Sequence, residues 1–399
     1  MEHNSSNVEC RYDALIIGGG PAGAAAATTL ARGGLHVALL DKAHFPRHKL
    51  CGGLLSERSR NVIAQVFGRE ADPPIEVTSR GVKLFFRAEL VNELLDYKPL
   101  HFTARWDFDH YLLAQAKAAG AKVLENTRAT GLSEDRTTVF TEGGQPLRAD
   151  FIVGADGASS RIRKALRSVR MDRSGFATAL EMEVPRAVIA RDIVDPEIYL
   201  GVVRWGYGWI FPKQKVLTVG IGGLATVNDE LRAAYTKFIE MALGRLPQHA
   251  IRGHPVPFGN YLSRPGEGRV LLVGDAAGLV EPITGEGIAF AMQSGYYAAQ
   301  AILEARHASA HGEALRRYEQ KYREIVRLFD DARYLRYLVF SKLFEPLFVD
   351  AVRASTTVMK KHMDVLAGDA TYRDYFRYFS RAALRRLPKL LSGPAQKRA

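Results

Sequence analysis

Two glycine-rich segments, separated by more than half of the chain, constrain the fold most strongly. The first is Gly18–Gly23 (GGGPAG), and the second is Arg269–Gly278 (RVLLVGDAAG). Each follows an apolar pattern typical of a buried strand and precedes a helical pattern. One such element is common at nucleotide sites. Two of them, with an acidic motif between, predict one long dinucleotide that an α/β fold holds at both ends.

The first segment has the pattern of a pyrophosphate cradle. A strand pattern over Tyr12–Ile17 leads into it, and a helix rich in small residues follows over Ala22–Arg32. Gly18 permits the tight turn, Gly20 lets the backbone approach a phosphate, and Gly23 lets helix and strand pack closely. Free N–H groups and the dipole at the helix N-terminus favour negative charge there.

A carboxylate lies at the position where dinucleotide-binding folds contact the ribose. The next strand, Val37–Leu40, ends at Asp41, about 20 residues beyond the glycines, where it can accept hydrogen bonds from the adenosine ribose. The alternative is a tight strand–helix turn without a ligand, but the strand–helix–strand context and Asp41 favour the ligand. FAD is the dinucleotide that fits best, so we expect a redox enzyme.

Composition agrees with a large globular enzyme. A chain of 399 residues with 47% hydrophobic content can bury a large core, and residues 1–11 lack the apolar centre of a signal peptide. Cys10 and Cys51 are the only cysteines, so no disulfide framework is expected and a reducing cytoplasm fits best. The uncharged run 14–31 is broken by glycines and Pro21, which favours a nucleotide-binding unit over a membrane span.

The net charge of +12 is partly concentrated at the C-terminus. Phe376–Ala399 contains seven Lys/Arg residues and no acid, interleaved with aromatic residues and leucines. Such a basic amphipathic segment can lie on anionic lipid, which would place the protein peripherally on the inner face of the membrane. The alternative is a solvated helix that packs on its own domain. No recognised motif accompanies the charge, so a nucleic-acid partner is not expected.

The order of patterns predicts an α/β protein with a Rossmann-type FAD-binding domain. A mostly antiparallel β-sheet that binds the substrate interrupts this domain, and a helical, basic segment follows it. The predicted boundaries are residues 11–80, 105–170 and 262–330 for the FAD-binding domain, 81–104 and 171–261 for the sheet, and 331–399 for the C-terminal segment.

Several motifs resemble those of the flavoprotein group that includes para-hydroxybenzoate hydroxylase. They are Gly18–Gly23 with Asp41, Gly154–Arg161 (GADGASSR), Gly274 with Asp275, and the helix start Arg105–Leu112 (RWDFDHYL). Narrower motifs resemble the geranylgeranyl reductase family over residues 11–330. These are Pro46–Gly53 (PRHKLCGG), Tyr207–Pro212 (YGWIFP) and Pro282–Ile288 (PITGEGI).

The resemblance implies a set of cofactor contacts. In the family the residue matching Asp275 binds the ribityl chain, and the turn Thr284–Ile288 opens a helix whose N-terminus would face the pyrimidine edge of the flavin. Reduced flavin carries negative charge there, which a helix N-terminus stabilises. The predicted FAD-binding residues are Gly18, Gly20, Pro21, Ala22, Gly23, Asp41, Lys42, Lys49, Cys51, Gly52, Arg105, Asp156, Gly274, Asp275, Gly285, Gly287 and Ile288.

Cys51 is a candidate proton donor, because the matching loop in the reductase family lies near flavin and substrate. A thiol with an ordinary pKa of about 8.5 stays mostly protonated at neutral pH, which suits an acid. The alternative is a small buried apolar residue without a chemical role.

Four aromatic residues have the period-two spacing of one strand face: Trp205, Tyr207, Trp209 and Phe211. An aromatic wall suits a polyene chain, because it gives apolar contact and stabilises developing positive charge. The alternative is a core face of the sheet. Related halogenases carry a similar Trp-x-Trp-x-Ile motif, but the outer residues here are closer to the reductase pattern. Together with Cys51, we expect Tyr207 and Trp209 to be catalytic.

The resemblance therefore implies an FAD-dependent reductase of isolated C=C bonds in an isoprenoid chain, with a hydride from reduced flavin and a proton from the protein. Arg47, His48 and Lys49 are candidates for binding a polar head group. No second dinucleotide unit is visible, so NAD(P)H or a protein donor would bind transiently.

Two alternatives stay open at this point. A flavin monooxygenase (a hydroxylase, epoxidase or halogenase) would share nearly all of the FAD-binding residues. A non-catalytic, flavin-loaded lipid-binding protein would show no turnover. No metal site is expected, since the pair His307 and His311 lacks a third ligand.

Overall fold

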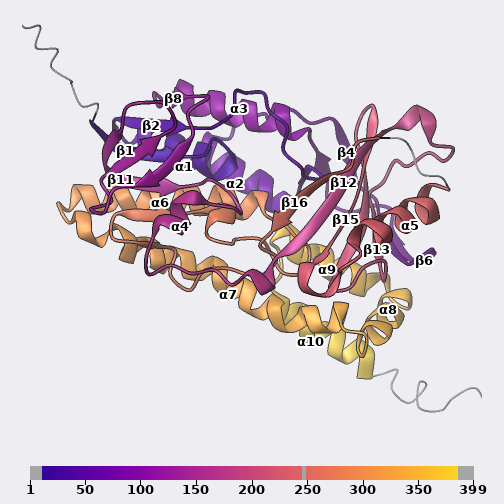
Figure 1. Cartoon of the computed structure of the whole chain (residues 1–399). Coiled ribbons are helices and arrows are strands. Elements are labelled where there is room, and N and C mark those ends of the chain that lie inside the picture. Colours follow the sequence, from indigo (N-terminus) through magenta and orange to yellow (C-terminus); the bar gives the residue numbers. More distant parts are fainter. Residues whose placement is uncertain (1–10, 245–248, 385–399) are drawn as a thin grey trace, which may run out of the picture.

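The computed structural model describes residues 11–244 and 249–384. A parallel sheet with its helices forms one end of the molecule, and a second sheet forms the other (Figure 1). Helix α7 (Ala314–Phe340) connects the two ends, because Tyr318 and Tyr322 pack into the core of the first and Val339 and Phe340 into the core of the second.

The first sheet has the order β17-β18-β11-β1-β2-β8, and every neighbouring pair from β18 to β8 is parallel. The side chains of Ala14–Ile17 are buried, as expected of a parallel strand covered on both faces. The strands are β1 (Arg11–Ile17), β2 (Val37–Leu40), β8 (Lys122–Leu124), β9 (Ala129–Leu132), β10 (Thr138–Thr141), β11 (Leu147–Gly154), β17 (Gly266–Glu267) and β18 (Val270–Leu272).

Two glycines let the helices of this sheet approach it and each other. A Cβ on Gly23 in α1 (Pro21–Arg32) would overlap the carbonyl oxygen of Gly18, and a Cβ on Gly295 in α6 (Ile288–His307) would overlap that of Ala22. Gly23 thus lies in the close contact between helix and strand that its spacing predicts, and α6 packs on α1 at the neighbouring Ala22. The other helices are α2 (Glu57–Phe67), α3 (Arg105–Ala118) and α4 (Arg161–Ala165).

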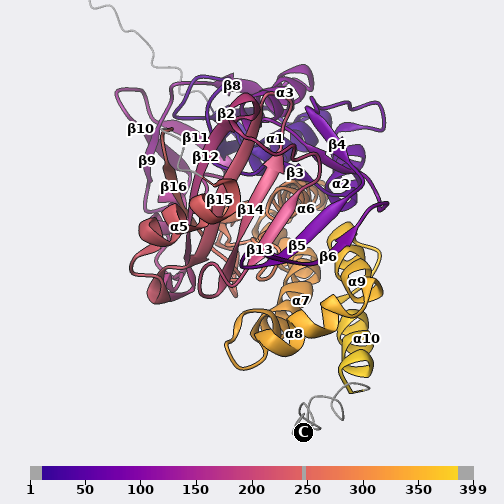
Figure 2. The ribbon, with the colours of Figure 1, turned by 90° about the vertical axis from the view of Figure 1, so that its right-hand side faces the viewer.

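The second sheet has the order β16-β12-β15-β14-β13-β5-β6 and is antiparallel except between β13 and β5. One face packs on α5 (Leu231–Leu243), and the other faces the C-terminal helices (Figure 2). The strands are β5 (Val82–Phe86), β6 (Glu89–Leu94), β12 (Ala177–Pro185), β13 (Glu197–Leu200), β14 (Gly206–Pro212), β15 (Val216–Leu224) and β16 (Arg252–Val256). A small sheet holds β3 (Leu54–Leu55), β4 (Val77–Ser79) and β7 (Leu100–Phe102).

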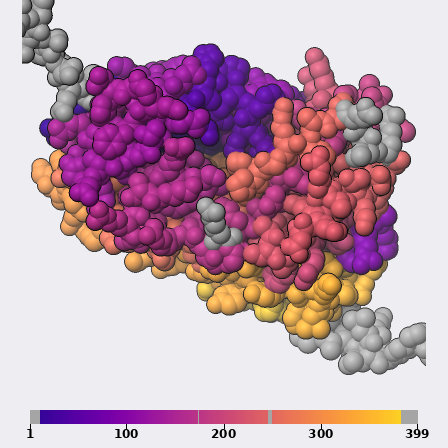
Figure 3. Space-filling view, in the orientation of Figure 1, coloured from indigo at the N-terminus to yellow at the C-terminus, as the bar shows by residue number. Residues whose placement is uncertain are grey.

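The C-terminal helices border the second sheet along one side (Figure 3). They are α8 (Glu345–Arg353), α9 (Thr356–Ala367) and α10 (Tyr372–Leu384). In α10 the buried residues Tyr372, Tyr375 and Phe379 pack into this core, so the described part of the basic segment is a domain helix. The rest of that segment, residues 385–399, lies outside the described residues. Within residues 11–244 and 249–384, no helix has the length and apolar character to cross a membrane.

Gly295→Ala is expected to lower the free energy of unfolding by about 1–3 kcal/mol, because the methyl group would push α6 away from Ala22. This cost outweighs the better helix propensity of Ala, about 1 kcal/mol. Gly312→Ala is the matched control, since nothing lies within 4 Å of its Cβ position, and it should change the free energy by less than about 0.5 kcal/mol. Urea unfolding followed by circular dichroism measures both, and equal midpoints would contradict the tight contact.

Candidate functional site

One cavity of about 1200 Å³ joins the two ends of the molecule. Its wall starts at the Gly18–Ala22 turn, continues along the loop 47–54 and strand β14, and ends among the C-terminal helices. It is larger than the roughly 300–1,000 Å³ of most small-molecule pockets. Of the predicted cofactor-binding residues, all line it except Gly23 and Gly274, which lie behind the wall where α1, β1 and α6 pack together.

The glycine turn leaves room and hydrogen-bond donors for an anion. Gly18 has a φ of +112°, which favours glycine, and a Cβ on Gly20 would meet only the Arg47 guanidinium, at 3.7 Å. No side chain caps the first turn of α1, so its N–H groups remain available. This cradle fits the pyrophosphate of a dinucleotide.

Asp41 holds the turn in place. Its Oδ2 accepts a hydrogen bond from the N–H of Gly19 at 2.7 Å, and its Oδ1 accepts one from Ala43 at 2.9 Å. Each carboxylate oxygen has a second acceptor position, so the predicted contact to a ribose remains chemically available.

Two arginines share one buried carboxylate beside the cradle. Arg105 donates two hydrogen bonds to Asp109, at 2.7 and 2.9 Å, and the Arg47 guanidinium lies 3.3 Å from the same carboxylate. The Arg47 guanidinium also lies 3.8 Å from Asp41, so both arginines at this wall have carboxylate partners. Asp109 was not among the predicted site residues, although its spacing of four residues from Arg105 within the motif Arg105–Leu112 is a signal for such a pair.

Asp156 has a structural task at the cavity wall. It accepts the hydroxyl hydrogen bond of Ser160 and the N–H of Arg161 at 2.6 Å, and so fixes the first turn of α4. The predicted contact of Asp156 to the cofactor stays a prediction.

The late glycine motif meets the aromatic strand. Gly285 has a φ of +70°, and a Cβ there would lie 2.9 Å from the Tyr207 hydroxyl, which donates to the Thr284 carbonyl. Buried Glu281 fixes this turn by accepting hydrogen bonds from the N–H of Ile283 and the hydroxyl of Tyr372. No side chain caps α6, so its N-terminus is free to stabilise negative charge in the cavity.

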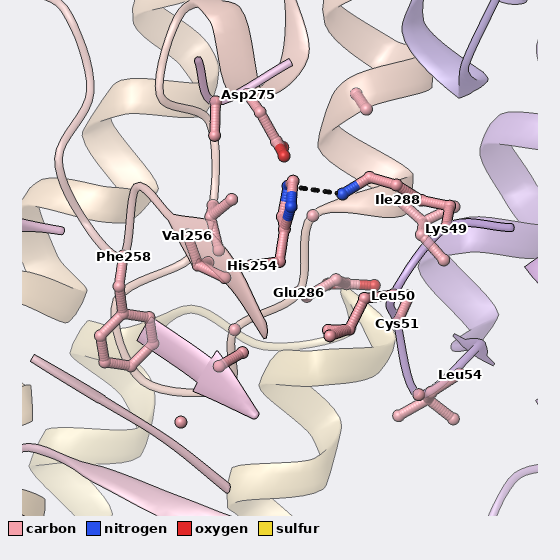
Figure 4. A pocket seen from close by; sticks show the side chains of 18 of the residues that line it. Lys49, Leu50, Cys51, Leu54, His254, Val256, Phe258, Asp275, Glu286 and Ile288 are labelled. Atoms are coloured by element: carbon pink, nitrogen blue, oxygen red, sulfur yellow. Dashed lines mark hydrogen bonds between the residues drawn. The ribbon is translucent and has the colours of Figure 1, made fainter. Parts of the chain in front are cut away.

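Lys49 carries a buried charge in this wall. Its ammonium donates to Nε2 of His254 at 2.6 Å, and the Asp275 carboxylate points toward the pair (Figure 4). Burial lowers the pKa of Lys49, and burial and the Lys49 charge lower the pKa of His254 to about 4. His254 is therefore neutral and accepts. No motif indicated His254, because Lys49 and His254 are 205 positions apart in the chain.

Two positions in the loop after Lys49 are too close to neighbouring groups to carry a side chain. A Cβ on Gly52 would overlap the ring of Phe211, and Gly53, with a φ of +77°, lies against the Thr103 carbonyl oxygen. Cys51 donates its backbone N–H to Oε1 of Glu181 at 3.2 Å, and its sulfur accepts from the N–H of Gly53 at 3.4 Å. Both Cys51 and Gly52 line the cavity.

Tyr207, Trp209 and Phe211 line the cavity from β14 as predicted, with ring centroids 5.9 and 6.4 Å apart. Trp209 lies over Gly220, where a Cβ would overlap the indole. The prediction for Trp205 is wrong. Its backbone turns (φ 52°) before β14 begins, and its ring packs edge-on against Tyr337 of α7, outside the cavity lining.

The far end of the cavity is mostly apolar, with His362 of α9 as a polar exception, and was not predicted. Amphipathic spacing in the C-terminal segment was the only signal for it. Such spacing predicts an apolar helix face but not which part of the protein that face packs against. The residues that line this end are Val339, Phe340, Phe348, Val352, Met359 and Met363.

Buried Glu286 marks the border between the polar and apolar parts. It accepts from the Ser56 hydroxyl and lies 3.4 Å from the Arg58 guanidinium, and burial raises its pKa to about 7. Among residues 11–244 and 249–384, no cluster of side chains could hold a metal ion.

Gly20→Val should retain little or no flavin, because the side chain would fill the phosphate cradle without straining the fold. The backbone of Gly20 is extended (φ −75°, ψ −175°), a conformation that valine adopts readily. The ratio of flavin to protein absorbance measures this. Gly131→Val in β9 is the control and should keep its flavin, because Gly131 is not part of the cavity lining and no described atom lies within 4 Å of its Cβ position. Full occupancy in both variants would rule out this cradle.

A family model described as an FAD binding domain matches residues 11–204 and 251–331. A geranylgeranyl diphosphate reductase of Rhodobacter capsulatus is 31% identical over 311 residues, covering 73% of this chain and 75% of that protein. A digeranylgeranylglycerophospholipid reductase of Thermoplasma acidophilum is 29% identical over 356 residues, covering 82% and 85%.

A solved structure from Thermoplasma acidophilum, described as geranylgeranyl bacteriochlorophyll reductase-like, has a TM-score of 0.79 and 25% identity. The superposition covers 94% of this chain and 99% of the Thermoplasma acidophilum chain. The same fold, the matched cofactor domain and the glycine cradles agree on FAD as the cofactor and on an FAD-dependent oxidoreductase. The chain therefore belongs to the geranylgeranyl reductase family of FAD-binding flavoproteins.

Proposed function

We propose that this protein reduces isolated C=C bonds in the isoprenoid chain of a geranylgeranyl-type lipid. One observation carries the proposal: the cavity that begins at the dinucleotide cradle continues past an aromatic wall into an apolar chamber. A polyene chain needs such a chamber, since each buried CH₂ contributes about 0.8 kcal/mol. The names of the two reductase relatives support the same substrate class.

Bound, reduced FAD supplies a hydride in this reaction, and the chain's residues supply the rest. The rings of Tyr207 and Trp209 face the cavity, where they can stabilise positive charge that develops at the tertiary alkene carbon. Cys51, on the same wall, is the proposed donor of the proton that the other product C–H bond requires. The buried side chains around them exclude water from the alkene.

The head group of the substrate is proposed to bind at a basic surface on the cavity wall. His48 and Arg252 lie there with the Arg252 guanidinium 3.2 Å from Nδ1 of His48, and within the described chain neither forms an ion pair. A diphosphate or a phospholipid phosphate would satisfy these donors. The electron donor, NAD(P)H or a protein, is proposed to bind transiently.

The decisive experiment is anaerobic. The purified protein is reduced with dithionite and mixed with geranylgeranyl diphosphate, while the flavin spectrum and the lipid mass are followed together. Flavin reoxidation with a hydrogenated product is expected. A product that forms only after oxygen is admitted, and contains oxygen, would instead identify a monooxygenase. No product under either condition would overturn the assignment for this substrate.

Cys51→Ala should slow this single turnover by roughly 10²-fold, the lower range for loss of a general acid, while flavin binding is kept. Cys10→Ala removes the other thiol and is the control. Unchanged turnover in Cys51→Ala would remove the proposed acid role.

Membrane contact is proposed at the corner between α7 and α8. Leu343 and Phe344 are exposed there (78% and 44%) beside Lys342, while Phe340 and Phe348 on either side line the apolar end of the cavity. This corner can reach the interface of a bilayer and let an isoprenoid chain pass directly into the cavity.

Leu343→Glu is expected to reduce sedimentation with vesicles of phosphatidylglycerol and phosphatidylcholine several-fold, because a charge replaces the inserted side chain. Met241→Glu, at an exposed position of α5 away from α8 (Figures 1 and 2), is the control and should bind normally. Equal loss in both variants would point to net charge rather than to this corner.

A further inference from the structure

A buried carboxylate lies behind the aromatic wall, in one row with Trp209. Glu181 of β12 pairs with Gly220 of β15, and Gly220 pairs with Trp209 of β14. Directly paired residues of antiparallel strands place their side chains on the same face. Because Gly220 has no side chain, the indole lies across it toward β12, and its Nε1 is 2.9 Å from where a Cβ of Gly220 would be.

The two polar ends of this row have no other partner. Among the described residues, neither Nε1 of Trp209 nor Oε2 of Glu181 forms a hydrogen bond, although both atoms are buried. An indole N–H only donates and a carboxylate oxygen accepts, so the two are complementary. The other oxygen of Glu181 already accepts the backbone N–H of Cys51, at 3.2 Å.

Glu181 also faces a second, small cavity. It measures about 30 Å³, enough for one or two waters, and the loop residues Leu50 and Cys51 line both this cavity and the large one. Lys213, almost fully buried, lies beside it with its ammonium 3.4 Å from Glu183. The carboxylate thus stands on the hidden side of the Cys51 loop, with the substrate chamber on the other side.

We propose that Glu181, in its ionised form, is a positioning residue that ties the Cys51 loop to the Trp209 ring. Ionised, it can accept from two donors, the backbone N–H of Cys51 in the loop and the indole N–H of Trp209 in β14, which meet at one wall. When Glu181 is protonated, its O–H would face one of the two N–H donors, and that hydrogen bond would be lost. The consequence for turnover depends on the reductase activity proposed above, but the contact to the indole does not.

The charge balance sets the pH at which this contact changes. Burial raises the pKa of Glu181 to about 7, and Glu183 adds to the rise. Lys213, the Cys51 N–H and the Trp209 indole lower the pKa. Three further cations line the small cavity with Glu181: Arg252 of β16, which is its pairing partner, Lys49 and Arg105.

The raised pKa has a defined effect on stability. The folded protein holds this proton more tightly than the unfolded chain, whose carboxyl has a pKa near 4.5. The stabilisation is complete below that value and is lost as the pH rises through about 7. Glu181→Gln removes the charge and keeps the shape of the side chain. It should therefore raise the melting temperature above pH 7, even where function is lost.

The first test uses Trp209 as its own reporter. In a Trp106→Phe, Trp205→Phe background it is the only tryptophan of the chain. Its emission should change with a midpoint near pH 7. The change should disappear in Glu181→Gln and persist in Glu183→Gln, which makes the same substitution two residues along the same strand. Identical titrations in both variants would overturn the proposal, whatever the enzyme reduces.

The second test is the anaerobic single turnover as a function of pH. Glu181→Gln should lower the rate roughly 10-fold above pH 7, the effect of losing one hydrogen bond to a charged group, with little change in the substrate concentration that half-saturates the rate. It should also remove the fall in wild-type rate below pH 7. Flavin content and the melting temperature at pH 8 should not fall.

Three results would contradict a positioning role. A rate equal to that of wild type at every pH would mean that the tether is irrelevant to catalysis. A lower melting temperature with lost flavin would mean that Glu181 is only structural. A rate loss of equal size in Glu183→Gln would mean that the rate depends on the total negative charge of β12 rather than on the contact between Glu181 and Trp209. Wild-type protein that is itself inactive would overturn the proposed function, and the emission titration would then decide this inference alone.

Discussion

The close approach of α1 and α6 is the constraint on which the rest of the site depends. Gly295 lets the second helix rest on the carbonyl of Ala22, two residues after Gly20 of the cradle, and Gly23 lets the first helix rest on Gly18. A side chain at Gly295 would separate the two helices, and one at Gly23 would push α1 away from the turn at Gly18. Because they are in contact, the uncapped N-termini of both helices open onto one cavity, although one lies near residue 20 and the other near residue 287.

From this shared corner the cavity changes character along its length. The end with the Arg47, Asp109 and Arg105 cluster offers guanidinium groups and the uncapped N–H groups of α1, which suit phosphates. The far end has mostly apolar and aromatic lining from the C-terminal helices. Between them, buried charges are held by neutral or opposite partners, such as Lys49 by His254. A buried charge is tolerated only with such partners, so their positions are restricted more than those of the apolar residues around them.

The proposed catalytic wall consists of the Cys51 loop and strand β14, which pack against each other. Gly52 lies against Phe211, and Gly220 lies beneath Trp209, so loop and strand approach at van der Waals distance. Glu181 adds a polar contact behind them. This arrangement places rigid rings and a thiol on one surface without a bulky residue in between, and it explains why glycines recur around the aromatic motif.

The sequence by itself determined the cofactor cradle, the strand–helix units and the three aromatic residues of β14. These features are local: a positive φ, a missing Cβ or an alternating apolar pattern is written into neighbouring residues. Only the tertiary structure decided that Lys49 meets His254, that Glu181 meets Cys51, that Trp205 leaves the wall, and that the C-terminal helices close the apolar end. Each of these depends on strand register or on packing between segments distant in the chain, where the entropy of bringing them together is offset by the whole core rather than by any single motif.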